Sequence, residues 1–285
     1  MSTLAHGAPA ARSLSNLPLA WLAELERRQP QLANVGHLML VATLPLLLAM
    51  TIDTRLVNGI GIWIKPVKFL VSLTVYYWTL AWFFGYLPRR AQRTRLGRFV
   101  IYTPIFAGIL EMVWLIGTAA AGQPAHFNRS APIYAISYSL AGVLATMLLV
   151  ALLVQGLMIA RDREIKLAPA FRLSLVLGAV VASVATLGVA GYLASGTGHW
   201  VGGVPSDAGG LPILGWSRSG GDLRVAHFWA LHASQLLPLA GWFITRAQID
   251  RRRALVWGVT VAYVALIAFT FAQALAGQPF LPWLG

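Results

Sequence analysis

Seven long apolar segments, separated by loops, constrain the fold of this chain more than any other feature. They run approximately over residues 32–50, 63–86, 99–120, 133–160, 171–193, 225–244 and 254–275. A helix rises 1.5 Å per residue, so about 20 apolar residues cross the roughly 30 Å hydrocarbon core of a bilayer. The sequence therefore predicts an all-α polytopic membrane protein with seven transmembrane helices.

The composition agrees with a membrane protein and excludes several other classes. The chain is 58% hydrophobic and 11% charged, whereas about a quarter of the residues in an average soluble domain are charged. Its net charge of +13 comes mainly from arginines in short loops, which indicates orientation in a bilayer and no nucleic-acid partner. The chain has no cysteine, so disulfides and thiolate metal sites are excluded.

The basic residues predict how the chain is oriented. Sixteen of the 22 lysines and arginines fall in the N-terminal tail or around the ends of segments two, four and six. They are Arg12, Arg27, Arg28, Arg89, Arg90, Arg93, Arg95, Arg98, Arg161, Arg163, Lys166, Arg172, Arg246, Arg251, Arg252 and Arg253. Cytoplasmic loops carry an excess of positive charge, so we expect a cytoplasmic N-terminus and a C-terminus outside.

This orientation divides the chain into three parts. Residues 1–31 form a cytoplasmic tail, in which LPLAWLAELERR has the apolar face of a short interfacial helix. Residues 32–275 form the membrane domain, and 276–285 form an outer tail. The loop at 195–224 is rich in glycine but holds Trp200 and Trp216, so we interpret it as a folded lid over the outer face.

Two parts of the chain resemble each other. KPVKF (65–69) and RVAHF (224–228) share a base-x-x-base-Phe pattern, each is followed by an RAQ tripeptide, and then by AGQP. The step from Arg90 to Ala121 is 31 residues and that from Arg246 to Ala276 is 30. The order predicts a parallel 3+1+3 repeat, with copies at about 32–124 and 171–279 and a linker helix at 133–160. This layout is similar to that of small sugar transporters of the SWEET type.

Basic residues at the outer helix starts point to an anion. Lys65 and Lys68 share a helix face, Arg224 and His227 repeat that spacing, and both pairs oppose the positive-inside bias. Helix N-termini also favour negative charge. Alternatively, these side chains reach lipid phosphates or pair with Glu111, Asp53 and Asp222. The predicted substrate-binding residues are Lys65, Lys68, Glu111, His126, Asn128, Arg129, Asp222, Arg224, His227, His232 and Gln235.

Glu111 and the histidines leave two chemistries open. Glu111 lies near mid-bilayer, where a carboxylate must be protonated, paired or facing water, and we expect Lys68 or His232 as its partner. His126, His227 and His232 are candidate metal or haem ligands. However, His227 and His232 are five residues apart, so a regular helix points them in different directions, and no cofactor is predicted.

The segments IKPVKF, GQPAHFN and GWSRSGGDLRVAHFWALHASQLLP resemble those of an uncharacterised family of bacterial multi-pass membrane proteins. The resemblance covers the chain from about residue 35 to its end and implies a bacterial plasma membrane location. It implies no activity.

These features predict a membrane protein that binds, and transports, a small anionic or zwitterionic solute or a lipid headgroup at an outward-facing cationic pocket. Membrane lipids are the other expected partner. One alternative is a metal- or haem-dependent enzyme or redox protein that uses the outer histidines. A second is a structural or accessory membrane subunit.

Overall fold

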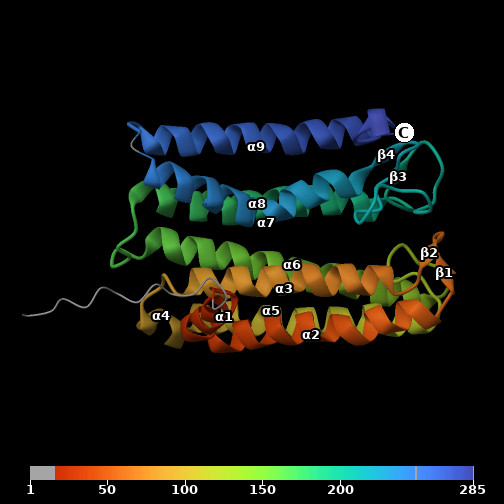
Figure 1. Cartoon of the computed structure of the whole chain (residues 1–285), viewed down its shortest axis with the longest axis horizontal. Helices are drawn as coiled ribbons and strands as arrows, with labels where there is room; N and C mark the ends of the chain where they lie inside the picture. The colour runs from red at the N-terminus through yellow and green to blue at the C-terminus, as the bar shows by residue number, and fades with distance from the viewer. Residues whose placement is uncertain (1–16, 248, 285) are drawn as a thin grey trace, which may run out of the picture.

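The structure, a computed structural model, describes residues 17–247 and 249–284. It is all-α apart from two short hairpins (Figure 1). The helices are α1 (Leu17–Arg28), α2 (Pro30–Ile52), α3 (Ile64–Phe84), α4 (Arg89–Arg93), α5 (Arg95–Ala120), α6 (Pro132–Arg161), α7 (Pro169–Ser195), α8 (Leu223–Arg246) and α9 (Arg252–Leu275). The strands are β1 (Leu56–Val57), β2 (Ile60–Gly61), β3 (Trp200–Val201) and β4 (Gly221–Asp222), and a 3₁₀ turn follows at Pro282–Leu284.

Each of the seven apolar segments forms one helix, with ends within four residues of those expected. Six of them, α2, α3, α5, α6, α7 and α9, are long and apolar enough to cross a membrane. Helix α8 has 24 residues but is more polar, because it carries Arg224, two histidines and Gln235. The chain is therefore a multi-pass helical membrane protein, whose described residues form six candidate spans and a seventh long helix packed among them.

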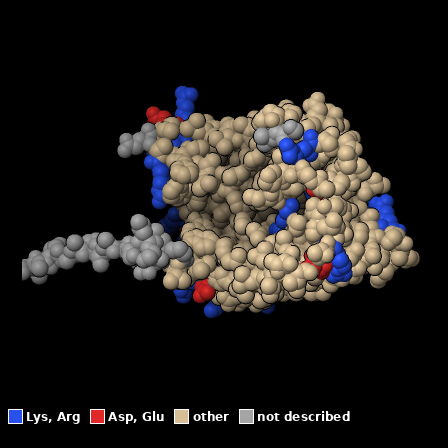
Figure 2. Space-filling model, turned by 45° about the vertical axis from the view of Figure 1, so that its right-hand side comes forward, with Lys and Arg blue, Asp and Glu red and all other residues tan. Residues whose placement is uncertain are grey.

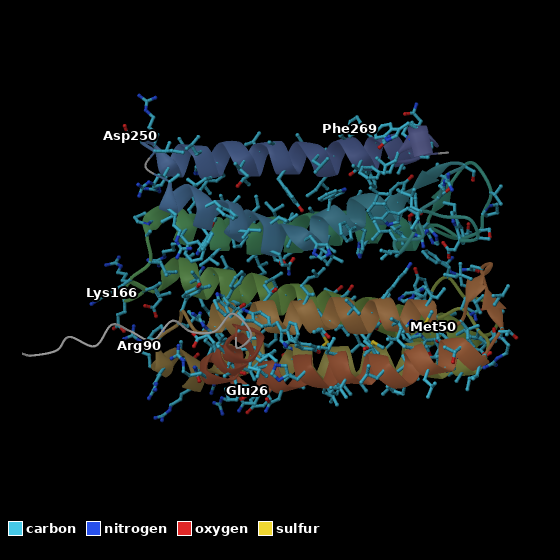
Figure 3. All side chains as sticks on the ribbon, viewed as in Figure 1. Glu26, Met50, Arg90, Lys166, Asp250 and Phe269 are labelled. Carbon is cyan, nitrogen blue, oxygen red and sulfur yellow. The ribbon has the colours of Figure 1, made fainter. Side chains whose placement is uncertain are left out.

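The two ends of the bundle differ. Helix α4 and the loop residues 162–168 and 249–251 lie at the left in Figure 1, and we call this the basic end because of its arginines. Figure 3 places Arg90, Lys166 and Asp250 there. The four strands lie at the right, which we call the hairpin end. Of the predicted tail, residues 1–16 with Arg12 lie outside the described residues.

Helix α1 forms where the sequence predicts an interfacial helix, but it also packs on α3. Leu25 is fully buried, and the Trp21 ring lies edge-on to that of Trp78, with the centroids 5.0 Å apart. The Arg28 guanidinium lies 4.1 Å from the Trp82 ring centroid, a cation–π contact. The helix is thus fixed to the membrane bundle by its own aromatic and basic side chains.

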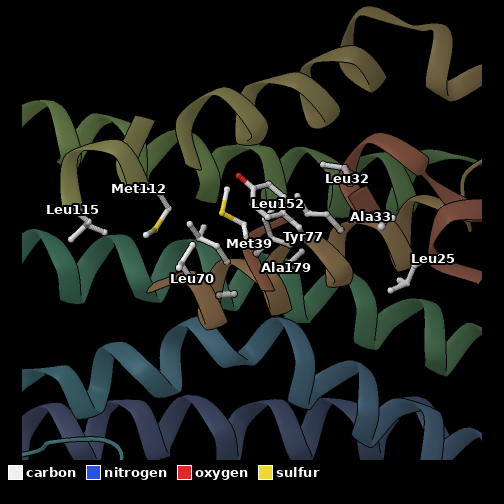
Figure 4. Close-up of a cluster of buried hydrophobic side chains, with 14 of the residues drawn as sticks. Leu25, Leu32, Ala33, Met39, Leu70, Tyr77, Met112, Leu115, Leu152 and Ala179 are labelled. Carbon is white, nitrogen blue, oxygen red and sulfur yellow. The ribbon is translucent and has the colours of Figure 1, made fainter. Parts of the chain in front are cut away.

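A hydrophobic core joins α1, α2, α3 and α5 and continues through α6 to α7 and α8 (Figure 4). Tyr77 of α3 is fully buried, and its hydroxyl donates a 2.7 Å hydrogen bond to the Pro104 carbonyl in α5. Helix α6 packs on α5 and on α7, and α7 packs extensively on α8. The second half, α7 to α9, is therefore connected to the first mainly through α6.

The two predicted repeat copies have similar helix ends. Lys65 is the second residue of α3 and Arg224 the second of α8, and each helix closely follows a hairpin strand. At the other ends, Gly122 and Gly277 have φ of +68° and +70°. The residue after each glycine closes the helix: the Gln123 N–H donates to the Thr118 carbonyl, and the Gln278 N–H donates to the Gln273 carbonyl. Both AGQP segments thus close their helices with a Schellman motif.

Candidate ligand-binding site

Four titratable side chains from separate segments converge at the hairpin end: Lys65 of α3, Glu111 of α5, His126 of the α5–α6 loop and His227 of α8. Nε2 of His126 lies 3.5 Å from Oε1 of Glu111, which is only 3% exposed. Lys65 interacts electrostatically with both Glu111 and His126, and His227 with His126. We call these four residues the central cluster.

The central cluster corrects the expected partner of Glu111. The sequence suggested Lys68 or His232, whereas the structure places His126 beside the carboxylate and Lys65 within electrostatic range. His126 lies in a loop, so helical periodicity carries no information about where its ring lies. The structure holds that ring between Phe69 and Tyr138, with centroid distances of 5.8 and 5.7 Å.

The central cluster is only partly satisfied. Oε2 of Glu111, Nδ1 of His126 and Nδ1 of His227 are buried and have no hydrogen-bond partner in the described part of the chain. Each such atom costs about 1–3 kcal/mol when it stays unpaired. Burial, with smaller contributions from Lys65 and His227, lowers the pKa of His126 well below its usual value. Its imidazole is therefore neutral at pH 7 and keeps one donor and one acceptor nitrogen.

A loop at 196–222, which we call the roof loop, lies next to this cluster at the hairpin end. Lys68 Nζ donates a 2.9 Å hydrogen bond to the Leu214 carbonyl. Arg224 donates to the Gly215 carbonyl at 2.7 Å and forms ion pairs with Asp207 at 2.8 Å and Asp222 at 2.6 Å. The roof loop is therefore attached to the first residues of both α3 and α8.

Asp207 is the central acceptor of the roof loop. Nε2 of His199 lies 3.1 Å from Oδ1 of Asp207, and the Asp207 N–H donates to the Asn58 carbonyl in the β1–β2 turn at 2.9 Å. Burial raises the pKa of Asp207, but the hydrogen bond with His199 and the charge of Arg224 outweigh it, so the pKa is lowered. Asp207 is therefore ionised at neutral pH and holds both hairpins together.

The predicted cations separate into two groups. Two carboxylates neutralise Arg224, and a backbone carbonyl partly compensates the charge of Lys68. Both side chains therefore bind the roof loop. Lys65 has neither a hydrogen bond nor an ion pair with any described residue. Asp222 also caps α8 by accepting from the Arg224 N–H at 3.0 Å, as expected for a helix N-cap.

The remaining predicted site residues lie apart from the central cluster. Asn128 Oδ1 accepts from the Ser130 N–H and hydroxyl, which closes a local turn, and Arg129 approaches the Ala194 carbonyl at 3.5 Å. His232 and Gln235 lie one and two turns beyond His227 on α8. Gln235 Nε2 donates to Thr79 Oγ1 of α3 at 3.1 Å.

The histidines do not form a metal site in the described residues, since no three His, Asp or Glu side chains there are placed to hold one ion. His227 faces the central cluster, whereas His232 packs on Phe228 with a centroid distance of 4.3 Å. The structure therefore gives no set of ligands for the metal-dependent alternative.

Sequence reasoning missed His199 and Asp207. Both lie in the glycine-rich roof loop, where no helical or strand period marks which side chains point inward. The local pattern S-D-A-G-G predicts only a turn at Asp207. Its three partners come from residues 58, 199 and 224, so only the tertiary fold brings them together.

The site thus belongs to a multi-pass helical membrane protein and lies between its two halves at the hairpin end. Comparison with protein-family models, with curated proteins and with solved structures finds no match to this chain.

Proposed function

We propose that this protein binds a small anionic or zwitterionic molecule, or a lipid headgroup of that charge, at the central cluster and transports it across a bacterial plasma membrane. The observation that carries the proposal is the set of three buried polar atoms without partners beside the unpaired Lys65. A ligand with acceptor oxygens satisfies the imidazole N–H groups and neutralises the ammonium at once.

Each member of the cluster has a role that follows from its chemistry. Lys65 supplies the positive charge, and neutral His126 and His227 donate hydrogen bonds to the anion. Glu111 accepts from a ligand amine or hydroxyl, or holds the proton that accompanies a weak acid. Beyond the central cluster, the transport path continues along the α3–α8 boundary. It is lined there by Lys68, His232 and Gln235.

For transport we propose seven spans, with α8 as the sixth in chain order, and the basic end in the cytoplasm. Helix α8 is as long as its neighbours and packs between α7 and α9, and its polar residues occupy the boundary with α3. The matching starts of α3 and α8 and the matching ends of α5 and α9 support a parallel repeat. Parallel repeats place a transported ligand at their interface, and in this chain the central cluster lies there.

The binding step is tested by thermal stabilisation of the detergent-purified protein. The probes are sn-glycerol 3-phosphate, as a soluble phosphate ester, and dioleoylphosphatidylglycerol, as a lipid with a phosphate diester. We expect at least one of them to raise the Tm of the wild type. Lys65→Ala removes the unpaired ammonium, so the Tm increase is expected to fall at least threefold.

Lys166→Ala is the matched control, because Lys166 is an exposed lysine at the basic end. It is expected to keep the full increase in Tm. The proposal is wrong if neither probe raises the Tm of the wild type, or if Lys65→Ala responds like Lys166→Ala.

A further inference from the structure

Helices α3 and α8 face each other across a cleft. Gln235 of α8 and Thr79 of α3 make the only hydrogen bond between these two helices in the described residues. Lys68, Ser72 and Val75 lie eleven, seven and four residues before Thr79, in steps of three or four, so they share its face of α3. Figure 2 shows a hollow on this side of the molecule, with Lys and Arg side chains at its hairpin end.

The cleft is unfilled on the hairpin side of the Thr79–Gln235 contact. Ser72 is exposed although it lies within a membrane span, and Leu231, one turn before Gln235 on α8, is 36% exposed. From Lys68 to Thr79 the helix rises about 16 Å. This is close to the half-thickness, about 15 Å, of the hydrocarbon core. The open part of the cleft therefore has the length of one leaflet.

The cleft has a charged end and an apolar body. Lys65 and Lys68 lie at the hairpin end, with the unpartnered nitrogens of His126 and His227 behind them. Between these lysines and the Thr79–Gln235 contact, α3 and α8 present Ser72, Val75 and Leu231. No charged residue lies in this part of the cleft. An occupant that fits both parts has an anionic head and a hydrocarbon tail.

The roof loop restricts the other route to the central cluster, from the water side. It is attached to α3 by Lys68, to α8 by Arg224 and to the β1–β2 turn by Asp207, whose N–H donates to Asn58. Between α3 and α8 the described residues form no ion pair and only the Thr79–Gln235 hydrogen bond. A ligand that enters sideways from the bilayer does not need to break the ion pairs of Arg224.

We propose that the ligand is an anionic phospholipid that enters the cleft between α3 and α8 from the outer leaflet, with its phosphate at Lys65 and its acyl chain along Ser72, Val75 and Leu231. This inference rests on the proposed function and selects a lipid over a soluble anion. The two lysines attract the lipid phosphate. The cleft binds the acyl chain because an empty apolar cleft in the membrane would otherwise have to be filled by water or covered by lipid.

The test compares a lipid with its headgroup on the full-length, detergent-purified protein. Dioleoylphosphatidylglycerol is expected to raise the Tm, and native mass spectrometry is expected to detect it bound. Millimolar sn-glycerol 3-phosphate and the uncharged dioleoylglycerol are each expected to produce less than a third of that shift. Ser72→Trp fills the cleft from an exposed position and is expected to remove most of the lipid-induced shift.

Val261→Trp is the matched control, because Val261 is 65% exposed on α9, away from the cleft. It is expected to keep the lipid-induced shift. If sn-glycerol 3-phosphate acts fully and Ser72→Trp keeps its response, the ligand is soluble, so the lipid inference fails while the proposed function stands. If neither probe acts, both fail. If Ser72→Trp instead converts a dimer to a monomer, the cleft is an interface between copies, and the lipid inference is overturned.

Discussion

At the residue scale, the hairpin end contains two kinds of charged site. Arg224 lies between Asp207 and Asp222 and has its charge balanced within the protein. Lys65 has no ion pair with a described carboxylate, although it interacts electrostatically with Asp207 and with Glu111, which is beside His126. A buried charge without a partner is costly, whereas a paired one is tolerated. This difference, and not the number of basic residues, distinguishes the candidate ligand site from the roof loop.

His199 makes the stability of the roof loop depend on pH. Burial lowers the pKa of His199 even though its hydrogen bond with Asp207 raises it. Below about pH 6.5, the usual pKa of a histidine, the unfolded chain therefore binds more protons than the folded protein, and stability falls as the pH falls. We expect the Tm to decrease from pH 7 to pH 5, and His199→Gln, which keeps a donor for Asp207, to make that decrease smaller.

Part of the pH dependence remains in His199→Gln, because burial also lowers the pKa of His126. Ser206→Ala is the control, since it changes the same loop and removes no titratable group. It is expected to keep the wild-type slope of Tm against pH. Equal slopes for His199→Gln and Ser206→Ala would contradict the role of His199.

The sequence identifies the residues of the site better than their partners. Lys65, Glu111, His126 and His227 are all candidates from the sequence, because a charge or histidine within or at the end of an apolar segment is conspicuous. Their arrangement depends on the α5–α6 loop and on the packing of α3 against α5, which periodicity does not determine. For the same reason the sequence offers Asp222 as a possible partner of Arg224 but not Asp207, which is 17 residues away in a loop.

At the element scale, helix positions follow from the apolar segments, but close contacts between helices do not. A side-chain Cβ placed on Gly241 of α8 would overlap the side chain of Ser174 on α7. Small residues at these positions let the two backbones approach closely, as is common in membrane helix pairs. Helix α8, the most polar of the long helices, is thus held in the bundle by its contact with α7.

Gly241→Ala is expected to lower the Tm, because overpacking typically costs about 1–3 kcal/mol and outweighs the gain in helix propensity of about 1 kcal/mol. Gly258 of α9 has no heavy atom within 4 Å of a built Cβ. Gly258→Ala is therefore the control and is expected to leave the Tm unchanged or raise it. A Tm for Gly241→Ala at or above that of Gly258→Ala would show that α7 and α8 are not in close contact.

At the scale of the whole molecule, the chain is two helical halves joined through α6 and the roof loop. A continuous hydrophobic core around Tyr77 extends through α6 to α7 and α8, whereas Thr79–Gln235 is the one hydrogen bond between α3 and α8 in the described residues. The polar residues of the candidate site therefore lie at a boundary where α3 and α8 make few direct contacts.

The absence of cysteine allows a direct test of the proposed topology. Single cysteines are introduced at three exposed positions: Ile213 in the roof loop, Trp283 near the C-terminus and Lys166 at the basic end. Intact bacterial spheroplasts are then treated with a membrane-impermeant maleimide. With seven spans and the basic end in the cytoplasm, Ile213→Cys and Trp283→Cys are labelled at once, and Lys166→Cys only after the membrane is permeabilised. If α8 does not cross the membrane, Ile213→Cys and Trp283→Cys are labelled from opposite sides. If the orientation is reversed, Lys166→Cys alone is labelled in intact spheroplasts.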